Sequence, residues 1–380
     1  MKRILLSLTG LLVGFLSIAQ ISVPPGGGSQ RSVVRQYLGA VSYVEISYNS
    51  PSVTGPNGQS RKGQIWGGLV PYGMQNLQFG LSSNENPSPW RAGADQNTTV
   101  EFSHDVTVNG KELKAGKYGF HIIPQESGEW TLIFSKDNNH WGSFFYRAEN
   151  DALRVGTTPI DAPFVENLSY EFVNRNADKV TVQLRWEEKA IPFDVVVPNS
   201  AQIHLAQIES ELNNQLGFSY SNLVAGANYA LGIGEKEKAL AWAEAAINAP
   251  FVGQKDFTSM STKAQVLMSM GKTDEAMTVM DEAVKLPGAT VFAIHGYGRQ
   301  LIGAGQKAKA LEIFKYNAKT NAGQWPVNYG LARGYSAVGD FKNAIKYMEL
   351  AMKNIPAGDT QNPPIMKANL EKLKKGEDIN

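Results

Sequence analysis

The chain has 380 residues, of which 42% are hydrophobic and 19% are charged, proportions that are typical of globular domains and not of disordered chains. Its formal net charge is +1, so the composition indicates no basic surface for nucleic acid. The sequence contains no cysteine, which excludes disulfides, thiolate metal ligands and cysteine nucleophiles.

The first residues have the pattern of a secretory signal peptide. Two basic residues precede an apolar stretch over residues 4–18, and small residues up to Ala19 predict cleavage before Gln20. The alternative, a transmembrane anchor, needs about 20 apolar residues and is therefore disfavoured. We expect an exported protein, periplasmic or extracellular and soluble once residues 1–19 are removed, with a flexible leader over residues 20–30.

Short alternating segments predict an all-β sandwich or barrel over residues 31–199. Residues 41–48 alternate and are rich in β-branched and aromatic side chains. Within residues 99–124, the pair Asn109-Gly110 is the one that a type I′ hairpin turn favours. Further strands are expected at Trp130–Ser135, Ser143–Arg147, Ser169–Val173, Val180–Glu187 and Ile191–Val197. Turn residues separate these segments, and no helical periodicity lies between them.

After Pro198 the pattern becomes helical and then repetitive. Residues 200–220 are expected to contain one bridging amphipathic helix, Ala201–Leu216. Over residues 221–357 a turn glycine is followed five residues later by alanine in four units: Gly234/Ala239, Gly271/Ala276, Gly305/Ala310 and Gly339/Ala344. Successive glycines are 37, 34 and 34 residues apart, and 34 residues is the period of tetratricopeptide repeats.

The repeat also places small residues where paired helices would cross. Twelve residues before each alanine stand Ala227, Ala264, Gly298 and Ala332; seven residues after it stand Ala246, Ala283 and Ala351, with Asn317 in the third unit instead. The units therefore resemble tetratricopeptide repeats, an all-α helical solenoid. Residues 358–380 are expected to form a capping helix and tail, because solenoids require a polar terminal cap.

The N-terminal half resembles a second family over residues 30–197. The segments that carry the resemblance are Gly67–Gly73, Trp90–Ala94, Thr98–Phe102, Gly110–Tyr118, Glu129–Thr131 and Trp141-Gly142. In this order they are similar to the exported domain-of-unknown-function family numbered twenty-nine eleven, although residues 74–89 form an extra polar stretch. The resemblance implies an exported β domain and implies no catalytic residue.

Searches for catalytic, metal and cofactor motifs are negative. No two histidines are three or four residues apart, as a helical zinc site requires, so we predict no metal site. His104 and His121 lie in neighbouring predicted strands and could approach each other. Lys272 and Thr273 follow a glycine but lack the rest of a phosphate-binding loop, so we predict no cofactor. The sequence leaves catalysis open and favours a protein that is not an enzyme.

Two groups of residues are candidate binding sites. In the β domain, Trp66, Tyr72, Trp90 and Arg91 combine aromatic faces with a guanidinium, a combination that suits a carbohydrate. The same residues could equally fill the core. In the repeats, positions three before and one after the small residue of each first helix are expected to face a groove. These positions are Val224, Asn228, Ser261, Gln265, His295, Arg299, Tyr329 and Arg333. Of these we predict Asn228, Gln265, His295, Arg299, Tyr329 and Arg333 as partner-binding residues.

These observations favour an exported binding or scaffold protein whose repeat groove engages a protein or peptide partner, because repeat solenoids usually supply contact surfaces. The arginines of the groove suit an acidic segment. The alternative is a carbohydrate-binding protein or hydrolase with its site near Trp90 and Arg91.

Overall fold

The computed structural model describes residues 29–380, which divide into two compact units between Ser200 and Ala201. Each unit is described by itself. The predicted signal peptide, its cleavage site and most of the leader lie outside the described residues. Within residues 29–380, no helix is long and apolar enough to cross a membrane.

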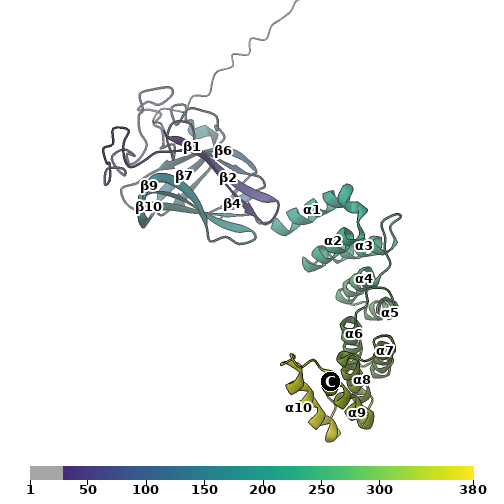
Figure 1. Cartoon of the computed structure of the whole chain (residues 1–380). Helices are drawn as coiled ribbons and strands as arrows, with labels where there is room; N and C mark the ends of the chain where they lie inside the picture. Colours follow the sequence, from purple (N-terminus) through teal and green to yellow (C-terminus); the bar gives the residue numbers. More distant parts are fainter. Residues whose placement is uncertain (1–28) are drawn as a thin grey trace, which may run out of the picture. The chain divides into compact units, whose positions relative to one another are not determined.

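The first unit consists of two antiparallel sheets (Figure 1). One sheet has six strands, in the order β1 (Gln30–Leu38), β2 (Ser42–Ser50), β3 (Thr99–Phe102), β6 (Gly116–Ile123), β7 (Trp130–Ser135) and β8 (Asp151–Thr157). The other has four, in the order β5 (Lys111–Leu113), β4 (Val106–Val108), β10 (Lys179–Val196) and β9 (Ile160–Val173). This arrangement confirms the predicted all-β fold class.

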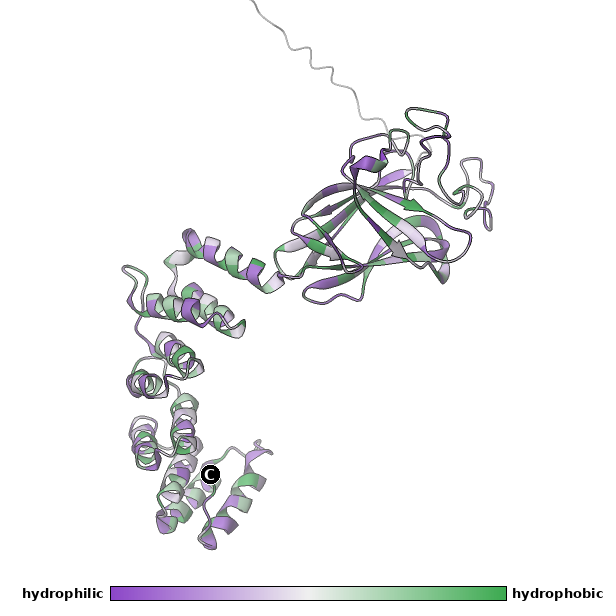
Figure 2. Ribbon diagram, turned by 180° about the vertical axis from the view of Figure 1, so that it is seen from behind, coloured by the Kyte–Doolittle hydropathy of each residue, from purple (hydrophilic) through white to green (hydrophobic). Residues whose placement is uncertain are grey.

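Aromatic side chains form the core between the sheets. Phe120 and Phe134 of the six-stranded sheet lie 5.1 Å apart between ring centroids, and Phe193 of β10 lies 5.5 Å from Phe120. All three side chains are fully buried. Hydrophobic and hydrophilic residues alternate along the strands (Figure 2), as expected where one face of each sheet packs on the core and the other faces solvent.

The strand predictions were right where the alternation is regular and wrong elsewhere. Asn109 and Gly110 have φ values of 45° and 78° and form the predicted turn between β4 and β5. Residues 143–145 form a turn, and residues 143–147 contain no strand. The two strands predicted over residues 180–197 are one strand, β10, because Glu187 has a positive φ of 53° and interrupts the alternation at a register shift.

Strands β1 and β8 were not predicted, and β1 already begins at Gln30. Its outward residues include polar and charged side chains as well as an exposed Val33, so its sequence lacks a clear apolar face. It is nevertheless paired along its whole length with β2, from Gln30 opposite Ser50 to Leu38 opposite Ser42. Pairing with β2, whose alternate residues are buried, therefore determines this strand.

Residues 51–98 connect β2 to β3 and contain no extended strand. Main-chain hydrogen bonds hold this segment against the sheets: Val53 N–H donates to Glu166 O, Gly73 N–H to Pro124 O, and Trp90 N–H to Ile122 O. Tyr170 of β9 donates its hydroxyl to the carbonyl of Ala92 at 2.8 Å. These hydrogen bonds make the segment an integral part of the β domain.

The second unit is a helical solenoid. Its helices are α1 (Ser200–Leu212), α2 (Tyr220–Gly232), α3 (Lys236–Asn248), α4 (Phe257–Ser269), α5 (Thr273–Ala283), α6 (Val291–Gly303), α7 (Lys307–Thr320), α8 (Trp325–Ala337), α9 (Phe341–Asn354) and α10 (Asn362–Lys374). The pairs α2/α3, α4/α5, α6/α7 and α8/α9 are the four predicted units. The predicted bridging helix ends at Leu212, and a short 3-10 helix, Gln215–Phe218, follows it.

The repeated residues have the roles that their spacing predicted. The four turn glycines all have positive φ, between 77° and 87°, a conformation that glycine adopts without strain. The four alanines that follow them are fully buried at 0% exposure. Small side chains allow the paired helices to approach closely, which accounts for the repeat.

Candidate functional site: a cleft in the repeat array

A cavity of about 940 Å³ lies between α4 and α6, with α5 contributing to its walls; we call it the α4–α6 cleft. Helix α4 contributes Gln265 and Met268, and α6 contributes Gly296 and Gln300. Methionines 277 and 280 come from α5. The lining is thus mainly apolar, with two glutamine amides, and a Cβ built on Gly296 would meet no atom within 4 Å.

The next crossing, between α6 and α8, is filled; we call it the α6–α8 crossing. Phe314 of α7 is fully buried there. A Cβ on Gly298, Gly330 or Gly334 would lie only 2.5–2.8 Å from its ring. These glycines therefore make room for the phenylalanine.

His295, a predicted partner-binding residue, belongs to this filled crossing. Its ring lies 5.5 Å from Phe314 and stacks at 6.0 Å on Tyr329, and its Nδ1 lies 3.1 Å from the carbonyl oxygen of Pro326. Burial lowers the pKa of His295 to about 4, with nearby arginines as smaller causes. At neutral pH this side chain is an uncharged packing group.

The predicted pair Tyr329 and Arg333 contacts other parts of the same chain. Tyr329 is buried, and its hydroxyl accepts hydrogen bonds from Arg333 at 3.0 Å and from Asn369 of α10 at 2.9 Å. Arg333 also lies over the Tyr329 ring and donates to Ile379 O and Asn380 Oδ1. Both side chains thus make their contacts within the chain itself.

Of the remaining predicted groove residues, Gln265 lines the α4–α6 cleft, while Asn228 and Arg299 are exposed on α2 and α6. Sequence reasoning missed Met268, Gly296 and Gln300. The repeat spacing could have pointed to Gly296, because it is the equivalent of Gly330 in the next unit. Gly330 packs against the Phe314 ring, whereas Gly296 faces open space.

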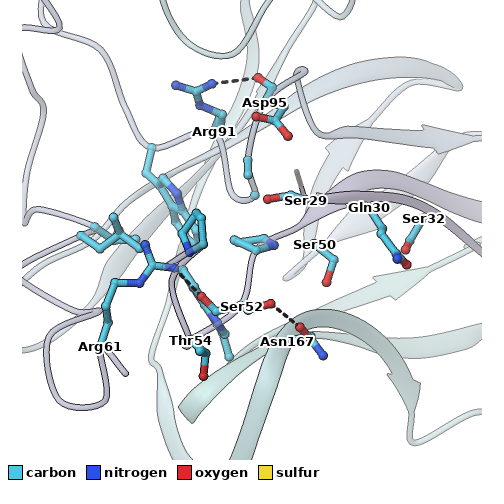
Figure 3. A pocket seen from close by; sticks show the side chains of 18 residues that line it. Ser29, Gln30, Ser32, Ser50, Ser52, Thr54, Arg61, Arg91, Asp95 and Asn167 are labelled. Carbon is cyan, nitrogen blue, oxygen red and sulfur yellow. Dashed lines mark hydrogen bonds between the residues drawn. The ribbon is translucent and has the colours of Figure 1, made fainter. Parts of the chain in front are cut away.

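The β domain contains a cavity of about 690 Å³, which we call the β cavity. Figure 3 shows that Arg61 and Arg91 reach it from different loops and that serine and threonine hydroxyls surround it. Arg61 donates to Ser52 O at 2.6 Å, and Asp95 is the one carboxylate among its lining residues within the described chain. The paired carboxylates of a sugar hydrolase are thus absent from its described walls.

Four tryptophans are clustered beside the β cavity. Trp66 contacts Trp90, Trp130 and Trp186 at centroid distances of 5.6, 5.2 and 6.0 Å. Trp90 and Trp186 stack at an interplanar angle of 16° and both line the cavity. The sequence left open whether these aromatic side chains form a binding site or the core. In the structure the same rings fill the domain interior and form a cavity wall.

Arg91 forms no ion pair with a carboxylate among the described residues, although the charge of Asp95 acts on it. Its Nη1 donates to the main-chain oxygen of Asp95 at 2.8 Å, and its guanidinium lies 5.1 Å from the Phe144 ring. Burial lowers the pKa of Arg91, as expected for a cation whose lost hydration is only partly replaced. Tyr72, by contrast, packs against Gly67 and is not among the cavity-lining residues.

The histidines of the β domain form no reactive cluster. His104 follows β3 and lies 3.0 Å from the Ser103 hydroxyl, whereas His121 lies in β6, opposite Ile133. His121 is 3.3 Å from Ser143, and burial above all lowers its pKa to about 3. Among the described residues, no group of three acidic or histidine side chains is placed to hold a metal ion.

Comparisons with known proteins agree with this division. Residues 29–195 match the family described as a protein of unknown function, DUF2911, and residues 258–289, which include most of α4 and all of α5, match the tetratricopeptide repeat. No curated protein matches the chain.

Several solved structures resemble the helical half. One is YrrB, a tetratricopeptide repeat protein described as having an unusual peptide-binding site, at 17% identity over 46% of this chain and 84% of that one, with a TM-score of 0.34. A second is a repeat protein from Cytophaga hutchinsonii, at 12% identity over 47% and 67%, with a TM-score of 0.37. A third is from Parabacteroides merdae, at 17% identity over 47% and 67%, with a TM-score of 0.36. The chain thus carries a region that matches DUF2911 and, after it, a region that matches the tetratricopeptide repeat.

Proposed function

We propose that the chain is an exported scaffold protein that binds an apolar, amphipathic segment of a partner protein in the α4–α6 cleft. The observation that carries the proposal is the cleft itself, about 940 Å³ in volume and lined mainly by apolar side chains. Large apolar concavities with a few polar groups are the usual form of binding sites. In this array α2 packs on α4, and α6 packs on α8. The equivalent pair between them, α4 and α6, lacks this close packing.

The lining residues indicate which chemistry the partner presents. Met268, Met277 and Met280 have flexible, polarisable side chains that adapt to apolar groups of different shapes. Gln265 and Gln300 offer amide donors and acceptors. No lysine, arginine or carboxylate is among the described lining residues. A segment with several aliphatic or aromatic side chains fits this lining better than the acidic segment suggested by the groove arginines.

Replacing Gly296 tests the cleft, because a side chain here would enter open space. We expect Gly296→Leu to keep the fold and to weaken binding of an amphipathic peptide, selected on a peptide array, by about tenfold or more. Gly232→Leu is the matched control, since a Cβ on Gly232 also meets no atom within 4 Å but lies outside the cleft. Equal binding by both variants would refute the assignment.

Export rests on the N-terminal sequence, where a basic start and an apolar stretch precede Ala19. We expect the mature protein from the periplasmic or extracellular fraction to begin at Gln20, as measured by intact mass. Recovery only in the cytoplasm, with residues 1–19 attached, would contradict export.

The β cavity supports a second candidate function, binding of an acidic carbohydrate. Trp90 is partly exposed and offers ring surface, and the buried Trp186 stacks behind it. Arg91 offers a cation that forms no ion pair among the described residues, although the charge of Asp95 acts on it. The indole N–H of Trp186 has no acceptor within the described chain. If uronate oligosaccharides bind here, calorimetry will show that Arg91→Met abolishes binding and that Arg147→Met, at an exposed position, preserves it.

A further inference from the structure

The last residues of the described chain fold back onto α8. Helix α10 ends at Lys374, and Gly376, with a φ of 75°, redirects the chain after it. Figure 1 shows the end of the chain, marked C, beside α8 and α10. Ile379 is 8% exposed and packs in a cluster with Tyr329, Ala332 and Leu370. The aliphatic side chain thus occupies a pocket formed by two helices.

Polar groups of α8 bind the main chain on both sides of Ile379. The Ser336 hydroxyl accepts a hydrogen bond from the Ile379 N–H at 3.1 Å, and Arg333 Nη1 donates to the Ile379 carbonyl at 3.3 Å. Both bonds go to main-chain groups, which every residue type except proline possesses. They therefore fix an extended segment in a defined register.

Side chains next to Ile379 are recognised as well. The carboxylate of Asp378 accepts from the Ser336 hydroxyl at 2.8 Å and lies 3.5 Å from Lys307 Nζ. The amide of Asn380 accepts from Arg333 Nη1 at 3.3 Å and donates to Arg333 O at 3.1 Å. Main-chain bonds combined with side-chain selection are the usual means by which proteins recognise extended peptides.

We propose that this surface of α8 is a peptide-binding site for the pattern acidic, aliphatic, amide, which residues 378–380 occupy in cis. A partner segment with the same chemistry must displace them. This inference rests on the proposed function in assuming a protein partner, but it concerns a different surface from the α4–α6 cleft. It also explains why Tyr329 and Arg333, which the repeat pattern predicted as partner-binding residues, contact other residues of the same chain.

The contacts are of a kind that can exchange. The ion pair between Lys307 and Asp378 joins partly exposed side chains, and such pairs contribute little to stability. A tethered segment acts at an effective concentration of about millimolar. A weak interaction in cis is therefore sufficient to block a free peptide of similar affinity.

The test uses a fluorescein-labelled peptide of residues 375–380 and fluorescence anisotropy. We expect saturable binding to the chain that lacks residues 377–380, at least about tenfold weaker binding to the full chain, and no binding of the peptide carrying Ile379→Asp. Ser336→Ala in the shortened chain should reduce binding, whereas Gly296→Leu should not, which separates this site from the cleft.

Folding is monitored by circular dichroism, and full-length Ile379→Asp, in which a charge would be buried, provides a second way to release the segment. If the released chains are folded and bind no peptide, residues 378–380 only cap the array and the proposal is wrong. Equal binding to full and released chains would also overturn it. If Gly296→Leu loses binding of the amphipathic peptide but still binds the peptide of residues 375–380 in the shortened chain, the α4–α6 cleft and the α8 surface are two separate binding sites.

Discussion

Two crossings of the repeat array are built on the same backbone plan and differ in what fills them. At the α6–α8 crossing, Phe314 lies against Gly330, and at the α4–α6 cleft the equivalent residues, 34 positions earlier, are Met280 and Gly296. Phe314 is fully buried, whereas Met280 is only half-buried and lines a cavity. A repeat fold therefore provides equivalent positions, and one side chain decides whether a position becomes core or binding surface.

Removing the ring that fills the α6–α8 crossing should have the largest effect. Phe314→Ala leaves three glycines facing an empty volume, so we expect a loss of about 3–5 kcal/mol in the free energy of unfolding. Urea unfolding followed by the helical dichroism signal measures it. Phe292→Ala, at a side chain 60% exposed, is the control and should cost far less. A small loss for Phe314→Ala would mean that this crossing is as open as the cleft.

Acid should weaken the filled crossing through His295. Its folded pKa of about 4 lies below the ordinary value of 6.5, so between these two pH values the unfolded chain binds a proton that the folded chain does not. Stability is therefore full above pH 6.5 and declines as the pH falls towards 4. The loss is up to about 3 kcal/mol, at about 1.4 kcal/mol for each pH unit.

The contribution of His295 is isolated by comparing urea midpoints of wild type and His295→Gln across this pH range. His121 of the β domain has the same sign of dependence, with a folded pKa of about 3, and remains in the variant. We expect the helical unit of His295→Gln to be less sensitive to acid than wild type. Identical pH profiles would show that the α6–α8 crossing does not exclude a charged imidazole.

The smallest effect concerns Asn317, which replaces the alanine found in the other three units. It is fully buried, and its Nδ2 donates to Val291 O at 3.0 Å while its Oδ1 accepts from Asn321 at 2.8 Å. Asn317→Ala restores the repeat pattern but removes these bonds, so we expect a loss of about 1 kcal/mol. Calorimetric melting measures it; a gain in stability would show that the alanine pattern alone governs this position.

Much of the fold followed from local sequence pattern. The glycine and alanine spacing identified the four units, and Asn109-Gly110 identified a hairpin turn. Strand β1 was missed because its pairing with β2, and not its own pattern, specifies it. Strand β10 was divided in two because Glu187 interrupts the alternation.

The candidate sites were less predictable than the fold. Gln265 was identified from its repeat position and lines the cleft, but Tyr329 and Arg333, selected by the same rule, contact α10 and residues 379–380. The rule that assigns groove positions from the repeat assumes that no other segment of the chain covers the groove. What covers a groove depends on segments about 40 residues away in sequence, for example Asn369 and Tyr329.

The sequence by itself determined the order of the two domains, their fold classes and the residues at which paired helices cross. Those features depend on side-chain size and hydrophobicity within a few residues or at a fixed period. Only the tertiary structure decided that the α4–α6 cleft is open, that Phe314 closes the next crossing and that Ile379 lies against α8. These outcomes depend on whether side chains from distant segments fill the same volume, which no local pattern encodes.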